Sequence, residues 1–85
     1  MEPCYSQVAD EHLDEIERSG NIQLYNDIVT VCEFILDNPD SAQSRSSAIT
    51  TEQGIRFRYA VPGRSPYKVF WSSDGPRIEA VFPRP

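Results

Sequence analysis

The sequence contains few of the residues on which disulfide-rich domains and metal sites depend. It has two cysteines, Cys4 and Cys32, and one histidine among 85 residues. Two cysteines so far apart are too few for a disulfide framework, and no second Cys or His pair supplies the spacing of a zinc site. We therefore expect reduced, partly buried thiols in a cytosolic protein, with no metal or other cofactor.

Long apolar runs are also missing. No stretch approaches the roughly 18 apolar residues that a membrane-spanning helix needs. The opening stretch, MEPCYSQVADEHLDEI, has neither a basic segment nor an apolar one, so we expect no signal peptide. The length suits one small domain, and we expect residues 1–85 to form a single soluble unit in the cytoplasm.

The patterns of common catalytic sites are absent as well. His12 lies in an acidic segment with no Cys or Ser placed near it by sequence, so we expect an exposed or helix-edge residue. The neighbouring acids lack the ligand spacing and tight glycine turn of a calcium loop. No glycine-rich phosphate loop is present, since Gly63 and Gly75 fall in predicted hairpin turns.

The net charge of −5 conceals a strong asymmetry between the two halves of the chain. Residues 1–44 carry ten acidic residues and one basic residue, whereas residues 45–85 carry seven basic and three acidic ones. Such asymmetry is typical of an interaction surface confined to one part of a chain. The alternative is that an acidic helical half and a basic sheet half attract each other, and charge alone leaves both interpretations open.

Hydrophobic spacing predicts two helices in the acidic half. Ser6 suits the N-cap of the first helix, which we expect to end at residues 19–20, and Asn21 suits the N-cap of the second, which ends at residues 37–39. The first helix has an apolar face of Val8, Ala9, Leu13 and Ile16. The second has a broader stripe of Leu24, Tyr25, Ile28, Val29, Val31, Cys32, Ile35 and Leu36. Their short connection predicts an antiparallel hairpin.

The basic half predicts a small antiparallel sheet. Residues 55–61, 67–71 and 77–82 read as strands, separated by the turns PGRSP and SSDGP. A short strand near residues 48–50 interrupts the polar loop 40–53, and residues 4–5 are a candidate entry strand. The expected fold class is therefore α+β, with the helical hairpin packed on one face of the sheet.

The stretch GIRFRYAV, residues 54–61, sets two arginines between large apolar side chains. We expect Ile55, Phe57, Tyr59 and Val61 to meet the helices, because successive strand side chains point to opposite faces. Arg56 and Arg58 then lie on the opposite face, beside Lys68 or its neighbour and beside Arg77 or Val81, depending on register.

Cations and aromatic rings are interleaved along these strands. The cations are Arg56, Arg58, Arg64, Lys68, Arg77 and Arg84, and the rings are Phe57, Tyr59, Tyr67, Phe70 and Trp71. Such a surface suits single-stranded RNA, whose phosphates pair with cations while its bases stack on rings. This pattern makes Arg64, Arg77 and Tyr59 candidate RNA-binding residues. The alternative is that outward strand positions are basic for solubility and edge protection.

Several short motifs, taken in order, resemble the RelE/ParE superfamily of bacterial toxins. They are S-x-x-A-x-x-x-L from Ser6, L-D-N-P ending at Pro39, Gly54-Ile55-Arg56, Tyr67-Lys68-Val69-Phe70-Trp71, and Asp74-Gly75 before an apolar last strand. The resemblance runs from Ser6 to Phe82 and implies a helical hairpin on an antiparallel sheet. It also implies a toxin of a type II toxin–antitoxin system, which a cognate antitoxin neutralises.

Two activities follow from the resemblance. The first is an endoribonuclease that cleaves mRNA on the ribosome, in which a ribose 2′-OH attacks the adjacent phosphate. Arg56, Arg58, Lys68 and Arg84 match the positions that surround that phosphate in RNA-cleaving relatives. The second is inhibition of DNA gyrase by binding alone, and a third hypothesis is an inactive member kept as a protein-interaction module. Many active relatives carry His or Tyr near the C-terminus, where this chain has Pro83.

Overall fold

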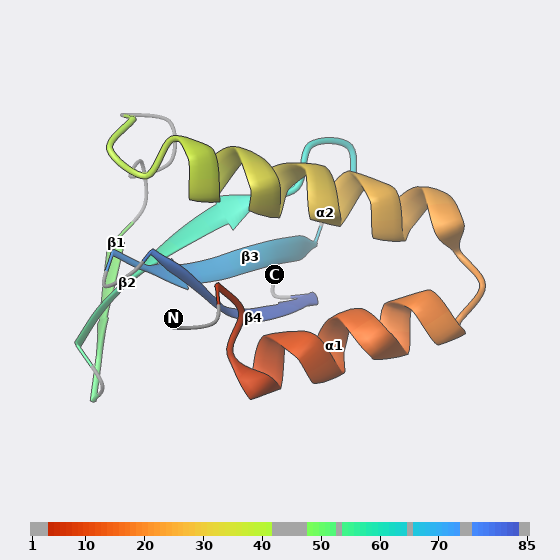
Figure 1. Cartoon of the computed structure of the whole chain (residues 1–85), viewed down its shortest axis with the longest axis horizontal. Coiled ribbons are helices and arrows are strands. Elements are labelled where there is room, and N and C mark those ends of the chain that lie inside the picture. Colours follow the sequence, from red (N-terminus) through yellow and green to blue (C-terminus); the bar gives the residue numbers. More distant parts are fainter. Residues whose placement is uncertain (1–3, 42–47, 53, 65, 74–75, 84–85) are drawn as a thin grey trace.

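The computed structural model describes residues 4–41, 48–52, 54–64, 66–73 and 76–83 (Figure 1). Within these residues two helices, α1 (Gln7–Arg18) and α2 (Ile22–Asp37), precede four strands. The strands are β1 (Ala48–Thr51), β2 (Gly54–Ala60), β3 (Tyr67–Ser72) and β4 (Arg77–Pro83). The predicted α+β class is confirmed. In the described ranges, neither helix has the length and hydrophobicity needed to cross a membrane.

Both helices begin at the residues that the sequence indicates. The Ala9 N–H donates to Ser6 Oγ at 3.1 Å, and the Leu24 N–H donates to Asn21 Oδ1 at 3.1 Å. Each cap therefore satisfies an amide that has no partner inside its helix. The chain reverses through Gly20, which has φ +84°, and α1 and α2 lie side by side as a hairpin (Figure 1).

The buried stripes of the helices follow the expected spacing with one exception. Ala9, Leu13 and Ile16 of α1 are buried, and the stripe of α2 is buried or packed against the core. Val8 was expected on the same face of α1 but is 50% exposed. That prediction is wrong because one residue along a helix turns the side chain by about 100°, away from the stripe that starts at Ala9.

The sheet is an antiparallel meander in the order β1-β2-β3-β4. Phe57 pairs with Trp71, which pairs with Ile78, and Tyr59 pairs with Val69, which pairs with Val81. Ile78 and Val81 are an odd number of residues apart, yet both are buried against the helices. A bulge in the β3–β4 pairing, opposite Phe70 and Trp71, makes this possible because it shifts the alternation of β4 by one residue.

The core lies between the helices and one face of this sheet. Trp71 and Val69 are completely buried there, and the Trp71 ring stacks on Phe57 with centroids 4.8 Å apart. Phe57 and Val61 face the helices as expected, but Ile55 is 59% exposed, which corrects the prediction for that residue. Ile55 pairs with Thr50 of β1, while α1 and α2 pack mainly on β3 and β4. The helices therefore do not cover the first part of β2.

The outer edge of β4 is covered by the N-terminal part of the chain. Tyr5 forms a parallel bridge with Ile78, in which the Ile78 N–H donates to the Cys4 carbonyl at 2.7 Å. The Ser6 hydroxyl donates to the Glu79 carbonyl at 2.6 Å, and the Val81 N–H donates to His12 Nδ1 at 3.1 Å. The half-buried His12 is thus a structural residue that satisfies an edge amide.

The two thiols have different surroundings. Cys4 is exposed and Cys32 is buried, and neither forms a disulfide. Burial raises the pKa of the Cys32 thiol to about 12, although a hydrogen bond with Tyr5 opposes the shift. The Cys32 thiol is therefore protonated and unreactive in the folded protein at neutral pH.

Candidate nucleic-acid interface

The sheet face turned away from the helices, called here the open face, carries most of the described basic residues of the strands. Arg58 pairs with Phe70, and Phe70 with Ala80, while Lys68 pairs with Ala60 and Phe82. Because directly paired residues share a face, this register fixes which side chains lie together. Among the described side chains of β2, β3 and β4, the open face is made of Arg56, Arg58, Ala60, Lys68, Phe70, Ser72, Arg77, Glu79, Ala80 and Phe82.

Arg58 and Lys68 form the basic end of the open face. They occupy diagonal positions on β2 and β3, a separation of roughly 7–8 Å in an antiparallel pair. Both side chains are half-buried. Beside them Phe70 is only 6% exposed, and its ring stacks on Phe82 with centroids 4.8 Å apart. Two cations therefore border a small aromatic cluster in which Phe82 is the more exposed ring, and cations so placed suit a phosphate.

The other end of the open face holds a compact charged cluster around Glu79. The Ser72 hydroxyl donates to Glu79 Oε2 at 2.7 Å, and Arg77 Nε donates to the same oxygen at 3.0 Å. Ser72 is 4% exposed, so its hydroxyl depends on this carboxylate for an acceptor. Arg77 lies on the open face, which resolves the choice between Arg77 and Val81 that the sequence left open.

The pKa of Glu79 is lowered from its ordinary value of 4.5. Burial acts in the opposite direction and is the largest single influence, but four favourable ones together exceed it. They are the hydrogen bonds from Ser72 and Arg77, the charge of Arg77 and the charge of Arg56. Glu79 is consequently ionised at neutral pH, and it offsets positive charge at this end of the face.

Two predicted site residues that the structure describes, Arg64 and Tyr59, are not brought together with these cations. Arg64 follows β2 and forms an ion pair with Asp27 of α2, with Nε 2.7 Å from Oδ2. Tyr59 faces the helices, where its ring lies 6.1 Å from that of Phe34. Arg84 lies outside the described residues, as does the predicted Asp74-Gly75 turn. Arg56, Arg58, Lys68 and Arg77 are the predicted residues that share the open face.

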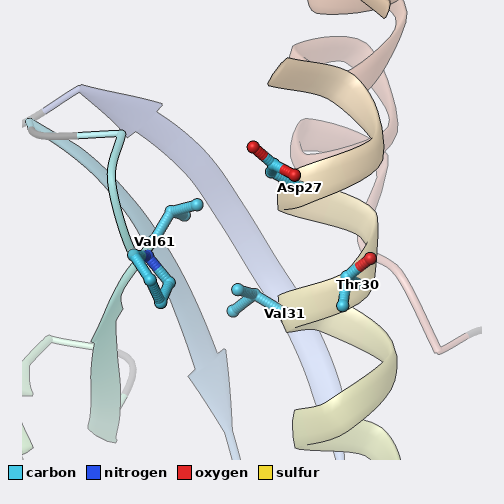
Figure 2. Close-up of a pocket in the computed structure, with 5 residues that line it drawn as sticks. Asp27, Thr30, Val31 and Val61 are labelled. Carbon is cyan, nitrogen blue, oxygen red and sulfur yellow. The ribbon is translucent and has the colours of Figure 1, made fainter. Parts of the chain in front are cut away.

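A shallow depression of about 230 Å³ lies between α2 and the end of β2 (Figure 2). Asp27, Thr30 and Val31 line it from α2, and Val61 and Pro62 line it from the opposite side. Asp27 at its rim is the ion-pair partner of Arg64. The depression is therefore part of the contact between the helices and the β2–β3 connection, and it is separate from the open face.

Sequence reasoning missed Glu79 and Ser72, whose importance depends on the bulge. A signal was present, because Ile78 and Val81 are apolar residues at a spacing that a regular strand cannot bury on one face. It also missed the role of His12, since the partner amide of Val81 lies 69 residues away along the chain. Local patterns contain no information about such a contact.

In the part of the chain that the structure describes, no group of three or more His, Cys, Asp or Glu side chains is placed to hold a metal ion. No protein-family model matches the chain, and no curated protein or solved structure matches it either. What the open face does is therefore inferred from its own residues, their register and their charges.

Proposed function

We propose that the chain is a RelE/ParE-type toxin of a toxin–antitoxin system and that its open face binds the phosphodiester backbone of mRNA. The observation that carries the proposal is the placement of Arg58 and Lys68 on one sheet face beside Phe70 and Phe82. The resemblance in motif order supports the family. The fold supports it only at the level of a helical hairpin on an antiparallel sheet.

The distribution of charge supports a polyanionic ligand on this face. The helical layer exposes many acids, including Asp10, Asp14, Glu15, Glu17 and Glu33, while Arg18 is its basic residue. An approaching RNA is repelled by the helices and attracted by the strands, so the asymmetry orients the encounter. The same basic face suits an acidic antitoxin segment that folds on binding.

The proposed reaction is attack of a ribose 2′-OH on the adjacent phosphate. Negative charge grows on the nonbridging oxygens and on the leaving 5′-oxygen, and a fixed guanidinium such as that of Arg58 stabilises it. Proton transfer falls to Lys68, because arginine remains protonated and is a poor base. Such a reaction needs no metal or other cofactor.

The second candidate is binding without cleavage, as in a gyrase inhibitor. One observation favours it: among the described residues of the open face there is neither a histidine nor a tyrosine to serve as general acid. Tyr59 and Tyr67 instead pack against the core. A surface of this kind still recognises a polyanion or an acidic partner, because recognition needs only the cations.

The test is expression in bacteria of the wild type and of the double variant Arg58→Ala/Lys68→Ala. The matched control is Arg18→Ala/Arg64→Ala, which removes the same charge outside the open face. Growth, protein synthesis and new mRNA 5′ ends are measured, together with binding of the purified proteins to single-stranded RNA at several salt concentrations. We expect toxicity and RNA binding to be lost in the Arg58/Lys68 variant and retained in the control.

Each alternative predicts a different result. Growth arrest without new mRNA ends, combined with inhibited DNA supercoiling, supports the gyrase inhibitor and excludes the nuclease. A folded wild-type protein that neither arrests growth nor binds RNA excludes the toxin proposal. Equal loss of activity in both double variants would show that total charge matters and that the open face does not.

A further inference from the structure

The Glu79 carboxylate accepts hydrogen bonds from the donors that an oxyanion site supplies. One oxygen, Oε2, receives the Ser72 hydroxyl at 2.7 Å and Arg77 Nε at 3.0 Å. The charge of Arg56 also acts on this carboxylate. Arg56 precedes Phe57, the partner of Trp71, and so lies on the open face next to Ser72. A hydroxyl and a guanidinium that donate to one oxygen, with a second cation on the neighbouring strand, are a common donor set for phosphate as well as carboxylate.

The donors are fixed by the fold. Ser72 is 4% exposed at the end of β3, and its register partner on β4 is Arg77. Glu79 lies where β4 bulges, and a bulge redirects side chains relative to a regular strand. The Ser6 hydroxyl, which donates to the Glu79 carbonyl, holds the backbone at this point. Ser72 and Arg77 therefore belong to a regular β3–β4 pair, whereas the carboxylate that accepts their hydrogen bonds belongs to Glu79, the residue at the bulge.

We propose that Ser72, Arg77 and Arg56 form a phosphate-binding site on the open face and that the Glu79 carboxylate occupies this site in the free protein. This inference rests on the proposed function for the identity of its ligand, the RNA backbone. A phosphodiester presents nonbridging oxygens with one negative charge, as a carboxylate does, so the two anions compete for the same donors. Their like charges prevent simultaneous binding.

Glu79 therefore limits where RNA binds on the open face. A first phosphate binds at Arg58 and Lys68, where the described residues include no acidic side chain. A second phosphate binds at Ser72 and Arg77 only when Glu79 is displaced. Displacement costs free energy, and the apparent affinity of the free protein for RNA is reduced accordingly.

The test compares the wild type with Glu79→Gln, using a single-stranded uridine oligonucleotide as the probe and inorganic phosphate as a competitor. Glutamine retains an amide oxygen that accepts from Ser72, so the fold is preserved, and circular dichroism verifies this. Glu15→Gln, on the exposed face of α1, is the control with the same change in charge. The double variant Ser72→Ala/Glu79→Gln removes one donor of the site without any further change in charge.

We expect Glu79→Gln to bind the oligonucleotide about tenfold more tightly than the wild type, the effect of one additional charge-assisted hydrogen bond. The slope of the logarithm of its binding constant against the logarithm of the salt concentration should steepen by about 0.7, the value for one additional phosphate contact on a single strand. Inorganic phosphate should compete more effectively with this variant. Ser72→Ala/Glu79→Gln should lose most of the gain, and Glu15→Gln should show little of it.

Two outcomes overturn the inference. One is an equal gain in Glu79→Gln and Glu15→Gln, which would reflect net charge alone. The other is a gain that Ser72→Ala leaves intact, which would mean that the phosphate does not use this donor. If either occurs while Arg58→Ala/Lys68→Ala still abolishes binding, the phosphate site is wrong and the proposed function stands. A gain in affinity that depends on Ser72, in a protein that does not arrest growth, would mean that the phosphate site exists and that the proposed toxin function is wrong.

Discussion

The two faces of the sheet use the same strands but are held together differently. On the helix-facing side, Trp71, Val69 and Ile78 are completely buried and belong to the apolar core. On the open face, the rings of Phe70 and Phe82 stack on each other, and charged side chains interact in specific pairs such as Arg77 and Glu79. Apolar burial is therefore concentrated on one face, whereas the other face carries the charged side chains.

Removing the largest buried side chain tests the first half of this comparison. Trp71→Ala should lower the free energy of unfolding by about 3–5 kcal/mol, because it leaves a large cavity beside Phe57. Ile55→Ala, at a position that is 59% exposed, should change it by less than about 0.5 kcal/mol. Urea unfolding followed by circular dichroism measures both. If Ile55→Ala lowered the free energy of unfolding as much as Trp71→Ala, Ile55 would have to be buried by the helices, so the helices would cover the whole of β2.

His12 lies at the seam between the faces, since it accepts from the Val81 amide and its ring meets Phe82 edge-on, with centroids 5.7 Å apart. His12→Phe retains an aromatic ring but removes the acceptor, so we expect a loss of about 1–2 kcal/mol in unfolding free energy. Glu11→Ala, exposed on the same helix, is the control. Hydrogen exchange at the Val81 amide should accelerate in His12→Phe, and unchanged exchange would contradict the structural role.

The open face should contribute a pH dependence of stability in the acid range. Because the pKa of Glu79 is lowered in the folded state, the folded protein binds fewer protons than the unfolded chain in this range. The stabilisation is therefore complete above the ordinary pKa of 4.5 and is lost as the pH falls through the lower, folded value. Acid unfolding of Glu79→Gln should show a shallower dependence below that pH. If the wild type and Glu79→Gln lost stability identically as the pH fell, Glu79 would make no contribution to this pH dependence.

The smallest effect is expected at the ion pair that joins the helical layer to the β2–β3 connection. The side chains of Arg64 and Asp27 are 30% and 48% exposed, so water and salt screen their attraction. A double-mutant cycle of Arg64→Ala and Asp27→Ala should give a coupling free energy below about 1 kcal/mol. A much larger value would show that this surface contact rivals the core packing.

The sequence was sufficient to predict elements whose signals are local. Ser6 and Asn21 are N-caps because their side chains satisfy amides three residues away. Alternation in residues 55–61 and the turn signals after them located β2, β3 and β4, and β1 was expected as a short strand in a polar loop. Alternation could not show where the covering helices stop, so the exposure of Ile55 was not predicted. The extent of a layer depends on tertiary packing, which strand periodicity does not encode.

The candidate site was predictable only in part, for a similar reason. Placing Arg56 and Arg58 opposite Phe57 required only the strand period, whereas placing Arg77 required the register of β4. The register of β4 depended on the bulge, and Asp27, the ion-pair partner of Arg64, lies 37 residues away along the chain. Charge composition therefore predicted a basic face, but it did not show that Glu79 offsets part of it.

The bridge between Tyr5 and Ile78 has a consequence for the order in which the protein folds. It joins residues that are 73 positions apart, and the contact from His12 to Val81 spans almost as far. Closing so long a loop costs chain entropy before any contact is gained, so we expect α1 to dock only after β4 has paired with β3. During synthesis, the part of α1 that packs on β4 must then stay uncovered until β4 has left the ribosome.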